Sequence, residues 1–364
     1  VRVKNEVIAV NRAEKTVTVR RLENGETYEE SYDTLVLATG SSPLKPPIPG
    51  IEHTGIVDSS GALSLEAIPA SLCIVGGGVI GAEMATLFNA LGCKVIVVEL
   101  LPQLLGNMDR DAAELLKKRL TAGGVAVNTD TAVSRIEAVR GGLKVYASRQ
   151  GREEMFTAEK VLVCTGRKAN SDGLGLDRLG ICTEGGAIQA DPVTLQTAIP
   201  HIYAVGDVNG RMQLAHAASA QGVVAVEHLS GIRSRIRLDL IPHCVYTQPE
   251  IASVGLTQQQ AESRGFDYEA GVFPLAANGK SLIEGEGKGF VKIIRDKRTD
   301  EMIGLHIVGA NATEMIGEGT MGIALEATVA ELLSLVHAHP TVAESIAEAA
   351  HVAAGQPIHI PQKK

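Results

Sequence analysis

Apolar and polar residues alternate with the periods of strands and helices through the second quarter of the chain. Leu72–Val75 is a wholly apolar run, which predicts a buried strand. In the following segment, Val79–Leu91, apolar residues recur at helical spacing and predict an amphipathic helix. These residues are Ile80, Met84, Leu87, Phe88 and Leu91. A second apolar strand, Val95–Glu99, comes next, so this region predicts a βαβ unit.

The same order of elements continues beyond this unit. Asp109–Ala122 predicts a second helix, which ends at Gly123-Gly124. Residues 142–158 predict a hairpin, and Lys160–Cys164 predicts another buried strand. The region therefore predicts one domain built on βαβ units.

Strand patterns with turn signals come before this domain. Val1–Val10 and Thr16–Arg20 are rich in β-branched residues, and Asn24-Gly25 is a strong turn signal. Together they predict a small antiparallel meander. Thr34–Ala38 predicts a short apolar strand, and the proline-rich stretch at residues 46–50 predicts a stiff linker at a domain boundary.

The pattern changes again in the last third of the chain. A strand at Ile202–Val205 and a helix at Gln213–Leu229 are predicted first. From about residue 241, strands and then helices are predicted, which is an α+β composition. The strands are Val272–Pro274, Gly289–Arg295 and Met302–Val308, and the helices are residues 313–335 and 341–354.

Composition narrows the classes of partner. The 364 residues include 34 basic and 42 acidic side chains, a net charge of −8, with no long basic stripe. Nucleic acid and anionic membranes are therefore poor candidate partners. The most apolar stretch, at residues 70–101, is interrupted by Glu83, Lys94 and Glu99, so we expect no membrane span. The N-terminus shows no signal-peptide pattern.

The first motif with chemical meaning is a glycine-rich turn. Gly76-Gly77-Gly78-Val79-Ile80-Gly81 fits GxGxxG, follows an apolar strand and opens an amphipathic helix. Such glycines let the backbone approach a pyrophosphate at the helix N-terminus. Glu99 ends the next strand. It can accept hydrogen bonds from ribose hydroxyls and repel the 2′-phosphate of NADP, which favours NAD. The alternative is a glycine-rich turn without a ligand.

Asp207 is a second candidate, because it follows the strand Tyr203-Ala204-Val205 in a Gly-Asp pair. A carboxylate at this edge of a sheet can bind a ribityl or sugar hydroxyl. Judged from the residues alone, a role as a helix cap or turn residue is the stronger alternative.

The third candidate is the pair His339 and Glu344, in the segment HAHPTVAE. In one interpretation Glu344 orients the imidazole of His339 and makes it a better general base. In another, Thr341 and Glu344 form a capping box at a helix start, and His339 is a surface residue. A metal pair of His337 and His339 is a weaker alternative, because no Cys or carboxylate stands at ligand spacing.

Several motifs in order resemble one known family. They are IVGGGVIGAE (74–83), VVE (97–99), VCTGRKANSDGLGL (163–176), IYAVGD (202–207), LAHAASAQG (214–222), YTQPEIASVG (246–255) and HAHPTVAE (337–344). From residue 34 onward the chain resembles dihydrolipoamide dehydrogenases, which are flavin-dependent pyridine nucleotide–disulfide oxidoreductases. Residues 1 to about 50 look more like the coenzyme A disulfide reductase and NADH oxidase branch.

The resemblance implies an α/β fold of nucleotide-binding, Rossmann-like FAD and NAD domains with a C-terminal α+β dimerisation domain. Residues 1–45 and 169–240 would belong to the FAD domain, 46–168 to the NAD-binding domain and 241–364 to the interface domain. It also implies FAD and NAD as cofactors, a homodimer, a cytoplasmic location, and a dihydrolipoyl-carrying protein of a 2-oxoacid dehydrogenase or related complex as partner.

The resemblance assigns residues to three sites. Those expected along FAD are Thr39, Gly40, Asp207, Gln213, Leu214, Ala215 and His216. Those expected along NAD are Gly76, Gly77, Gly78, Val79, Ile80, Gly81, Glu83, Glu99, Val133 and Gly166. His339 would be the acid–base group that serves a dithiol on the partner subunit, with Glu344 holding its ring.

The chain also departs from the family pattern. The family opens with a separate βαβ unit for the FAD pyrophosphate and carries reactive cysteines, and neither is found in these residues. We therefore expect a chain that lacks the N-terminal half of its FAD domain. The five cysteines, at 73, 93, 164, 182 and 244, are expected to be structural and mostly buried in a reducing compartment.

Two other functions remain open. A coenzyme A disulfide reductase or NADH oxidase is the nearest alternative, although the HAHPTVAE segment argues against it. A non-catalytic nucleotide-binding or dimerisation fragment is the other, because the redox cysteines are absent from these residues.

Overall fold

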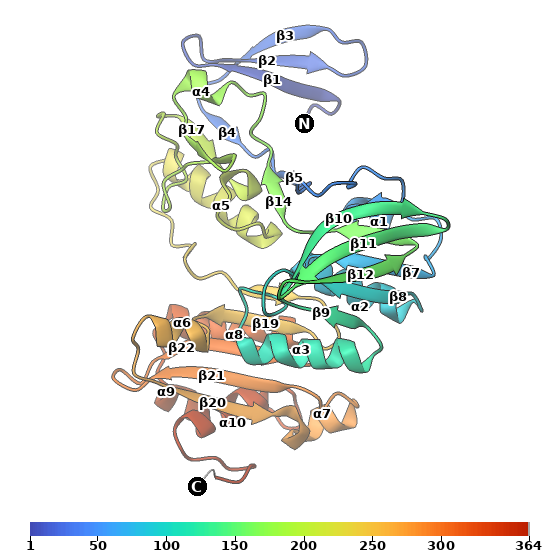
Figure 1. The fold of residues 1–364 in the computed structure, drawn as a ribbon. Coiled ribbons are helices and arrows are strands. Elements are labelled where there is room, and N and C mark those ends of the chain that lie inside the picture. Colours follow the sequence, from blue (N-terminus) through green and yellow to red (C-terminus); the bar gives the residue numbers. More distant parts are fainter. Residues whose placement is uncertain (363–364) are drawn as a thin grey trace. The chain divides into compact units, whose positions relative to one another are not determined.

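A computed structural model of the chain describes residues 1–362, which fold into two compact units (Figure 1). The first unit combines Val1–Leu44 with Arg167–Asp239. The second combines Lys45–Gly166 with residues 240–362. The chain thus leaves the first unit near the predicted proline-rich linker and returns to it after one domain's length. The assignment of these segments to FAD, NAD and interface domains stays a prediction.

The first unit begins with the predicted meander, which is confirmed. Its strands β1 (Asn5–Asn11), β2 (Thr16–Arg21) and β3 (Thr27–Ser31) form one antiparallel sheet. Alternate residues of β2, Val17 and Val19, are buried, as the period of two along a strand requires.

Two further strand pairs and a helix complete the main part of this unit. Strands β4 (Leu35–Leu37) and β17 (Ile202–Ala204) pair in parallel, and β5 (Ser41–Pro43) pairs with β14 (Arg167–Ala169) antiparallel. Helix α5 spans Ala215–Leu229. The remaining elements are α4 (Leu176–Leu179), β15 (Thr183–Glu184), β16 (Ala187–Ile188) and the 3-10 helix η1 (Gly206–Asn209).

The second unit contains a five-stranded parallel sheet, which we call the nucleotide sheet. Its order is β6-β13-β7-β8-β9, and its strands are Ile56–Val57, Lys160–Val163, Ser71–Val75, Lys94–Val98 and Ala126–Asn128. Helices α1 (Ser59–Leu63), α2 (Val79–Ala90) and α3 (Arg110–Ala122) belong to the same half of the unit. The predicted βαβ unit is confirmed.

Both faces of the nucleotide sheet are covered, which explains why its strands are apolar throughout. In β7, Leu72 and Ile74 pack into the core shared with α2 and α3. Their neighbours Cys73 and Val75 pack on the other face, against a three-stranded antiparallel sheet (Figure 1). That sheet consists of β10 (Thr131–Val139), β11 (Gly142–Arg149) and β12 (Arg152–Ala158). The sequence predicted the hairpin β11–β12 but missed β10.

The C-terminal half of the second unit has a five-stranded antiparallel sheet, the C-terminal sheet. Its order is β18-β19-β22-β21-β20, with strands His243–Val245, Ile251–Gly255, Met302–Val308, Phe290–Asp296 and Tyr268–Pro274. Helix α8 (Ala312–Ala324) packs on β19 and β22, and α10 (Glu344–Ala353) packs on β20 and β21. The other helical segments are α6 (Gln258–Ser263), η2 (Leu275–Ala277), α7 (Gly279–Ile283) and α9 (Val329–Leu333).

Two predicted helices have different bounds. The helix predicted over 313–335 is two helices, because α8 ends at Ala324 and Thr328 begins α9 with a capping box to Glu331. This box supplies acceptors to the first amides of a new helix and so marks a start. The last helix begins at Glu344 rather than at residue 341. The Thr341 hydroxyl lies in the turn before it, where it donates to the Ala338 carbonyl at 2.7 Å.

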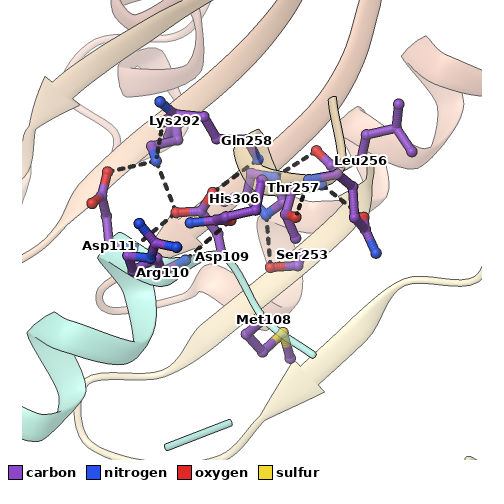
Figure 2. Close-up of polar contacts among 12 residues, drawn as sticks. Met108, Asp109, Arg110, Asp111, Ser253, Leu256, Thr257, Gln258, Lys292 and His306 are labelled. Carbon is purple, nitrogen blue, oxygen red and sulfur yellow. Dashed lines mark hydrogen bonds and ion pairs between the residues drawn. The ribbon is translucent and has the colours of Figure 1, made fainter. Parts of the chain in front are cut away.

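A buried ion pair joins helix α3 to the C-terminal sheet (Figure 2). The ammonium of Lys292 on β21 lies 2.8 Å from the carboxylate of Asp109, and both side chains are almost wholly buried. Asp109 is the N-cap of α3, and its other oxygen accepts from the Gln258 amide at 3.1 Å. Burial opposes the ionisation of Asp109, but the hydrogen bonds and charge around it outweigh burial and keep its pKa below the ordinary value.

His306 on β22 lies fully buried beside this pair. Its Nε2 is 2.9 Å from the Leu256 carbonyl oxygen, and its Nδ1 is 2.9 Å from the Ser253 hydroxyl. Since a carbonyl only accepts, Nε2 carries the proton. Burial lowers the pKa of His306, and the Lys292 ammonium acts in the same direction against the opposing charges of Asp109 and Asp111. The ring is therefore neutral in the folded protein at neutral pH.

This arrangement predicts a pH dependence of folding. Below about pH 6.5, the pKa of an unperturbed histidine, the unfolded chain takes up a proton at position 306 that the folded protein excludes. The free energy of unfolding should therefore decrease as the pH is lowered, by up to about 1.4 kcal/mol per pH unit for this group. Urea unfolding between about pH 8 and 5.5 measures it. In His306→Gln, the free energy of unfolding should depend less steeply on pH, because about one fewer proton is taken up on unfolding. An unchanged slope would mean that the folded protein holds His306 charged.

Candidate functional site

The glycines of the turn between β7 and α2 differ in the space around them. Gly76 has φ +110°, and a Cβ there would lie 2.6 Å from the Cys164 carbonyl oxygen. A Cβ at Gly81 would lie 2.0 Å from the Gly76 carbonyl oxygen. At Gly78, by contrast, a Cβ would meet no heavy atom within 4 Å. Protein atoms therefore leave no room for a side chain at Gly76 or Gly81, whereas the space beside Gly78 is open.

The carboxylate of Glu99 lies against this turn. Glu99 follows β8, is 8% exposed, and accepts hydrogen bonds from the amides of Gly77 and Leu101. The amide of Leu101 is 2.7 Å from the carboxylate. A carboxylate offers about four acceptor positions, so two amide bonds leave capacity for hydroxyl donors. Sequence reasoning identified Glu99 but not its two backbone partners.

A cavity of about 420 Å³ lies at the carboxyl ends of β7 and β8. Three of the predicted residues line it together, namely Gly76, Glu99 and Val133. Most other lining residues are apolar, among them Val98 and Ala132. Because β10 was missed, only the family resemblance placed Val133 in the same site as Glu99.

The remaining residues predicted for NAD do not line this cavity. Val79 and Ile80 are the first residues of α2, and both pack against the core of the nucleotide sheet. Gly166, with φ +139°, follows β13. Glu83 does not line the cavity. Its carboxylate accepts from the Tyr246 amide at 2.9 Å and borders a separate cavity of about 460 Å³. Burial raises the pKa of Glu83.

The residues predicted along FAD all lie in the first unit. Asp207 follows β17 within η1, and it accepts from the Ser41 hydroxyl at 2.6 Å. The guanidinium of Arg167 donates to the same hydroxyl at 2.6 Å and lies 3.8 Å from the Asp207 carboxylate. Asp207 lies within η1, and the N-cap of the following helix α5 is Leu214, so Asp207 does not cap that helix. Sequence reasoning missed Ser41 and Arg167, which are separated from Asp207 along the chain and carry no motif of their own.

Thr39 and Gly40 follow β4, beside the strand end that carries Asp207. The Thr39 hydroxyl donates to the Asn170 backbone carbonyl at 2.6 Å, and the Asn170 backbone amide donates to the Gly40 carbonyl at 2.9 Å. Gly40 has φ +71°, a conformation that favours glycine. The other predicted residues stand at the start of α5, where Leu214 is the N-cap and makes no side-chain cap bond. They are Gln213, Leu214, Ala215 and His216.

His339 and Glu344 lie in contact at the start of α10. Nδ1 of His339 is 2.9 Å from a Glu344 carboxylate oxygen, and the imidazole is 76% exposed. The second carboxylate oxygen accepts from the Asn278 side chain at 3.1 Å. Thr341 accepts from the Glu344 amide at 3.3 Å, so half of a capping box is present. The carboxylate of Glu344 contacts the ring and not the cap. Asn278, far away in sequence, was not predicted.

His337 has a different environment from His339. Its Nε2 is 2.9 Å from the Glu318 carboxylate on α8, and the side chain is 12% exposed. Within residues 1–362, no group of three or more His, Cys, Asp or Glu side chains is placed to hold a metal ion.

The five cysteines are all free. Cys73 and Cys93 are buried, and Cys164 and Cys244 are partly buried. Burial raises the pKa of Cys73 to about 12 and, together with the charge of Glu99, that of Cys164 to about 12. Cys182 is exposed, so the expectation of a buried thiol is wrong at this position. It directly precedes β15, whose two residues are also exposed.

Comparison with known proteins identifies the family. Residues 1–222 match the family described as pyridine nucleotide-disulphide oxidoreductase, and residues 241–350 match the dimerisation domain of the same family. The chain belongs to the pyridine nucleotide–disulphide oxidoreductases. It is an oxidoreductase of a family that uses FAD and NAD, and the predicted fold class is confirmed. Within residues 1–362, no helix has the length and apolar character needed to cross a membrane.

Relatives of this chain include dihydrolipoyl dehydrogenases. One from Bacillus subtilis is 39% identical over 349 residues, which cover 94% of this chain and 73% of the relative. One from Geobacillus stearothermophilus is 39% identical over 352 residues, covering 96% of this chain and 73% of the relative. The resemblance to dihydrolipoamide dehydrogenases is therefore confirmed.

Solved structures of flavoprotein disulfide reductases are similar as well. The Cu(II) complex of the HOCl-induced flavoprotein disulfide reductase RclA from Escherichia coli aligns with a TM-score of 0.86 and 28% identity, covering 95% of this chain and 77% of that one. LpdA from Mycobacterium tuberculosis aligns with a TM-score of 0.84 and 30% identity, covering 95% of this chain and 75% of that one.

The glycine turn gives a matched pair of substitutions. Gly78→Ala should leave the unfolding temperature unchanged, because its methyl group meets no atom within 4 Å. It should weaken NADH binding by about tenfold or more, since the methyl group fills the open side of the turn. Gly81→Ala should instead lower the unfolding temperature, because its methyl group meets the backbone at 2.0 Å. Calorimetric titration and thermal unfolding separate the two effects. Unchanged NADH affinity in a folded Gly78→Ala protein would contradict this assignment.

Proposed function

We propose that this chain works in a dihydrolipoyl dehydrogenase reaction, in which electrons pass between a dithiol, FAD and NAD. The contact between His339 and Glu344 carries the proposal, because it supplies an exposed imidazole held by a carboxylate. The cavity at Glu99 supports the nucleotide part. The names of the relatives support the dithiol part.

The cavity beside Glu99 fits the adenosine end of NAD. Its apolar walls suit an adenine ring, and its buried carboxylate suits ribose hydroxyls. The open side of Gly78 leaves room for a pyrophosphate at the N-terminus of α2. We assign Gly76–Gly81, Glu99, Val133 and Gly166 to this nucleotide. We also assign Glu83 to NAD, at a position further along α2 than the glycine turn.

The residues of the first unit fit FAD through a carboxylate that can accept from its hydroxyls. The partly exposed Asp207 carboxylate stands at the end of the parallel strands β4 and β17, where a polyol chain can donate to it. Thr39, Gly40 and Gln213–His216 belong to the same proposed site. FAD, when bound, supplies the two-electron carrier between dithiol and nicotinamide.

In this proposal, the imidazole of His339 accepts the proton of the dithiol substrate. Its Nδ1 faces a carboxylate, which only accepts, so Nδ1 donates and Nε2 keeps a lone pair. Nε2 can take the proton of a thiol, which leaves the thiolate that reacts. Glu344 holds the ring and stabilises the imidazolium that forms, and Asn278 holds Glu344 from the other side.

The proposal includes partners and a place in the cell. We infer a homodimer formed through the C-terminal half, supported by the match to the dimerisation domain. A dihydrolipoyl-carrying protein of a 2-oxoacid dehydrogenase or related complex is the proposed macromolecular partner. A cytoplasmic location is supported by five free cysteines, which a reducing compartment preserves.

Nucleotide preference tests the assignment of Glu99. NADH should bind more tightly than NADPH, because the 2′-phosphate would face the Glu99 carboxylate. Glu99→Gln removes the charge and keeps an oxygen acceptor for only one of the two amides. The dissociation constant of NADPH divided by that of NADH should therefore fall by about tenfold. Calorimetric titration with both nucleotides measures the ratio. Equal affinities in the unaltered protein, or tighter NADPH binding, would show that Glu99 does not face the ribose.

Substitution of His339 tests the acid–base role in a flavin-loaded form of the enzyme that carries the reactive cysteines of the family. His339→Gln should lower turnover with dihydrolipoamide by about 100-fold or more, the usual contribution of a general base. NADH-to-dye diaphorase activity does not need the dithiol and should persist. Glu344→Gln should cost less, because the amide still contacts the ring.

Thr341→Ala is the matched control for the capping alternative. It removes the hydroxyl that accepts from the Glu344 amide but leaves the ring contact in place, so dithiol turnover should persist. If diaphorase and dithiol activities fell together in His339→Gln, the residue would be structural. If neither fell, the assignment of His339 would be wrong.

A further inference from the structure

The segment from Glu99 to Asp109, which we call the 99–109 loop, has a buried carboxylate at each end. Glu99 is 8% exposed and Asp109 is fully buried. The Glu99 end binds the glycine turn through the Gly77 amide. The Asp109 end binds Lys292 of the C-terminal sheet at 2.8 Å. The loop therefore connects the candidate nucleotide cavity to a different sheet of the second unit.

The middle of the loop touches the glycine turn again. The Leu105 amide donates to the Gly77 carbonyl at 2.9 Å. A Cβ at Gly77 would lie 2.5 Å from the Leu104 side chain, and both leucines are almost wholly buried. The side chain of Gln103 donates to the Met108 carbonyl at 3.3 Å. With buried contacts at both ends and in the middle, the loop can move only if the turn or the ion pair also changes.

The Lys292 ammonium has three oxygen partners around the Asp109 end of the loop (Figure 2). They are the carboxylates of Asp109 at 2.8 Å and Asp111 at 2.5 Å and the Gln258 side-chain oxygen at 3.0 Å. Asp109 and Lys292 are buried, whereas the Asp111 side chain is 58% exposed. Removing one partner of a buried pair leaves an uncompensated charge, while loss of an exposed partner is cheap. Lys292 therefore supplies the charge that balances the buried Asp109 carboxylate, which the backbone amides of Gln258 and Asp111 also bond.

We propose that Lys292 and Asp109 are positioning residues for the nucleotide, because they hold the 99–109 loop and through it the Glu99 carboxylate and the glycine turn. The inference rests on the nucleotide site proposed above. It makes the C-terminal sheet, which contributes no residue to the lining of the cavity at Glu99, a determinant of NADH affinity. A pair that serves folding alone is the competing explanation.

Three substitutions separate these explanations in the flavin-loaded enzyme. In the NADH-to-dye diaphorase reaction, Lys292→Met and Asp109→Asn should each raise the KM for NADH by about tenfold. They should leave kcat within about twofold, because they disturb binding and not the reacting groups. Asp111→Asn is the matched control. It touches the same ammonium from the same helix but is exposed, so its KM should be unchanged. The dissociation constant of NADH, measured by calorimetry well below each unfolding temperature, should follow KM.

Each outcome decides the question. Lower unfolding temperatures with unchanged NADH affinity in Lys292→Met and Asp109→Asn would overturn the inference in favour of a purely structural pair. If Lys292→Met does not fold, Asp109→Asn decides alone, since it keeps the size of the side chain and an acceptor for the Gln258 amide. Glu99→Gln distinguishes the two proposals. If it weakens NADH binding while the two substitutions do not, only the positioning role is wrong. If the unaltered enzyme does not bind NADH, the nucleotide site and the positioning role are both wrong.

Discussion

The close approach of the backbone at Gly81 to the carbonyl of Gly76 is the constraint on which the second unit depends. It lets α2 begin directly above β7, so the helix can cover one face of the parallel sheet. It also places the Gly77 amide, just before α2, at the edge where β8 ends. Glu99 then meets the Gly77 amide at that edge. Packing and chemistry therefore share one turn, and a side chain at either glycine would disturb both.

The sequence predicted the parts of this arrangement that depend on local pattern. Leu72–Val75 and the apolar face of α2 identified the nucleotide sheet, because burial on both sides leaves an unmistakable apolar run. Strand β10 was missed, since its exposed and buried residues do not alternate cleanly. The split between α8 and α9 was missed because apolar residues continue across it, while the capping hydroxyl of Thr328 decides the new start.

The candidate sites show the same division. Residues within a motif, such as Glu99 and His339, could be named from sequence alone or with the family resemblance. Their partners could not. Asn278 reaches Glu344 from 66 positions away, and Lys292 reaches Asp109 from 183 positions away. Neither partner stands in a recognisable pattern, because a tertiary contact places no requirement on neighbouring residues in the chain.

The uneven burial of the cysteines has a practical consequence. A thiol reacts as its thiolate, so Cys73 and Cys164, with pKa values raised to about 12, are poorly reactive near neutral pH. Cys182 is the exposed thiol among the five and lies in the first unit. A maleimide dye should therefore attach there selectively. Such a label would report on the first unit during a titration without occupying the nucleotide cavity of the second.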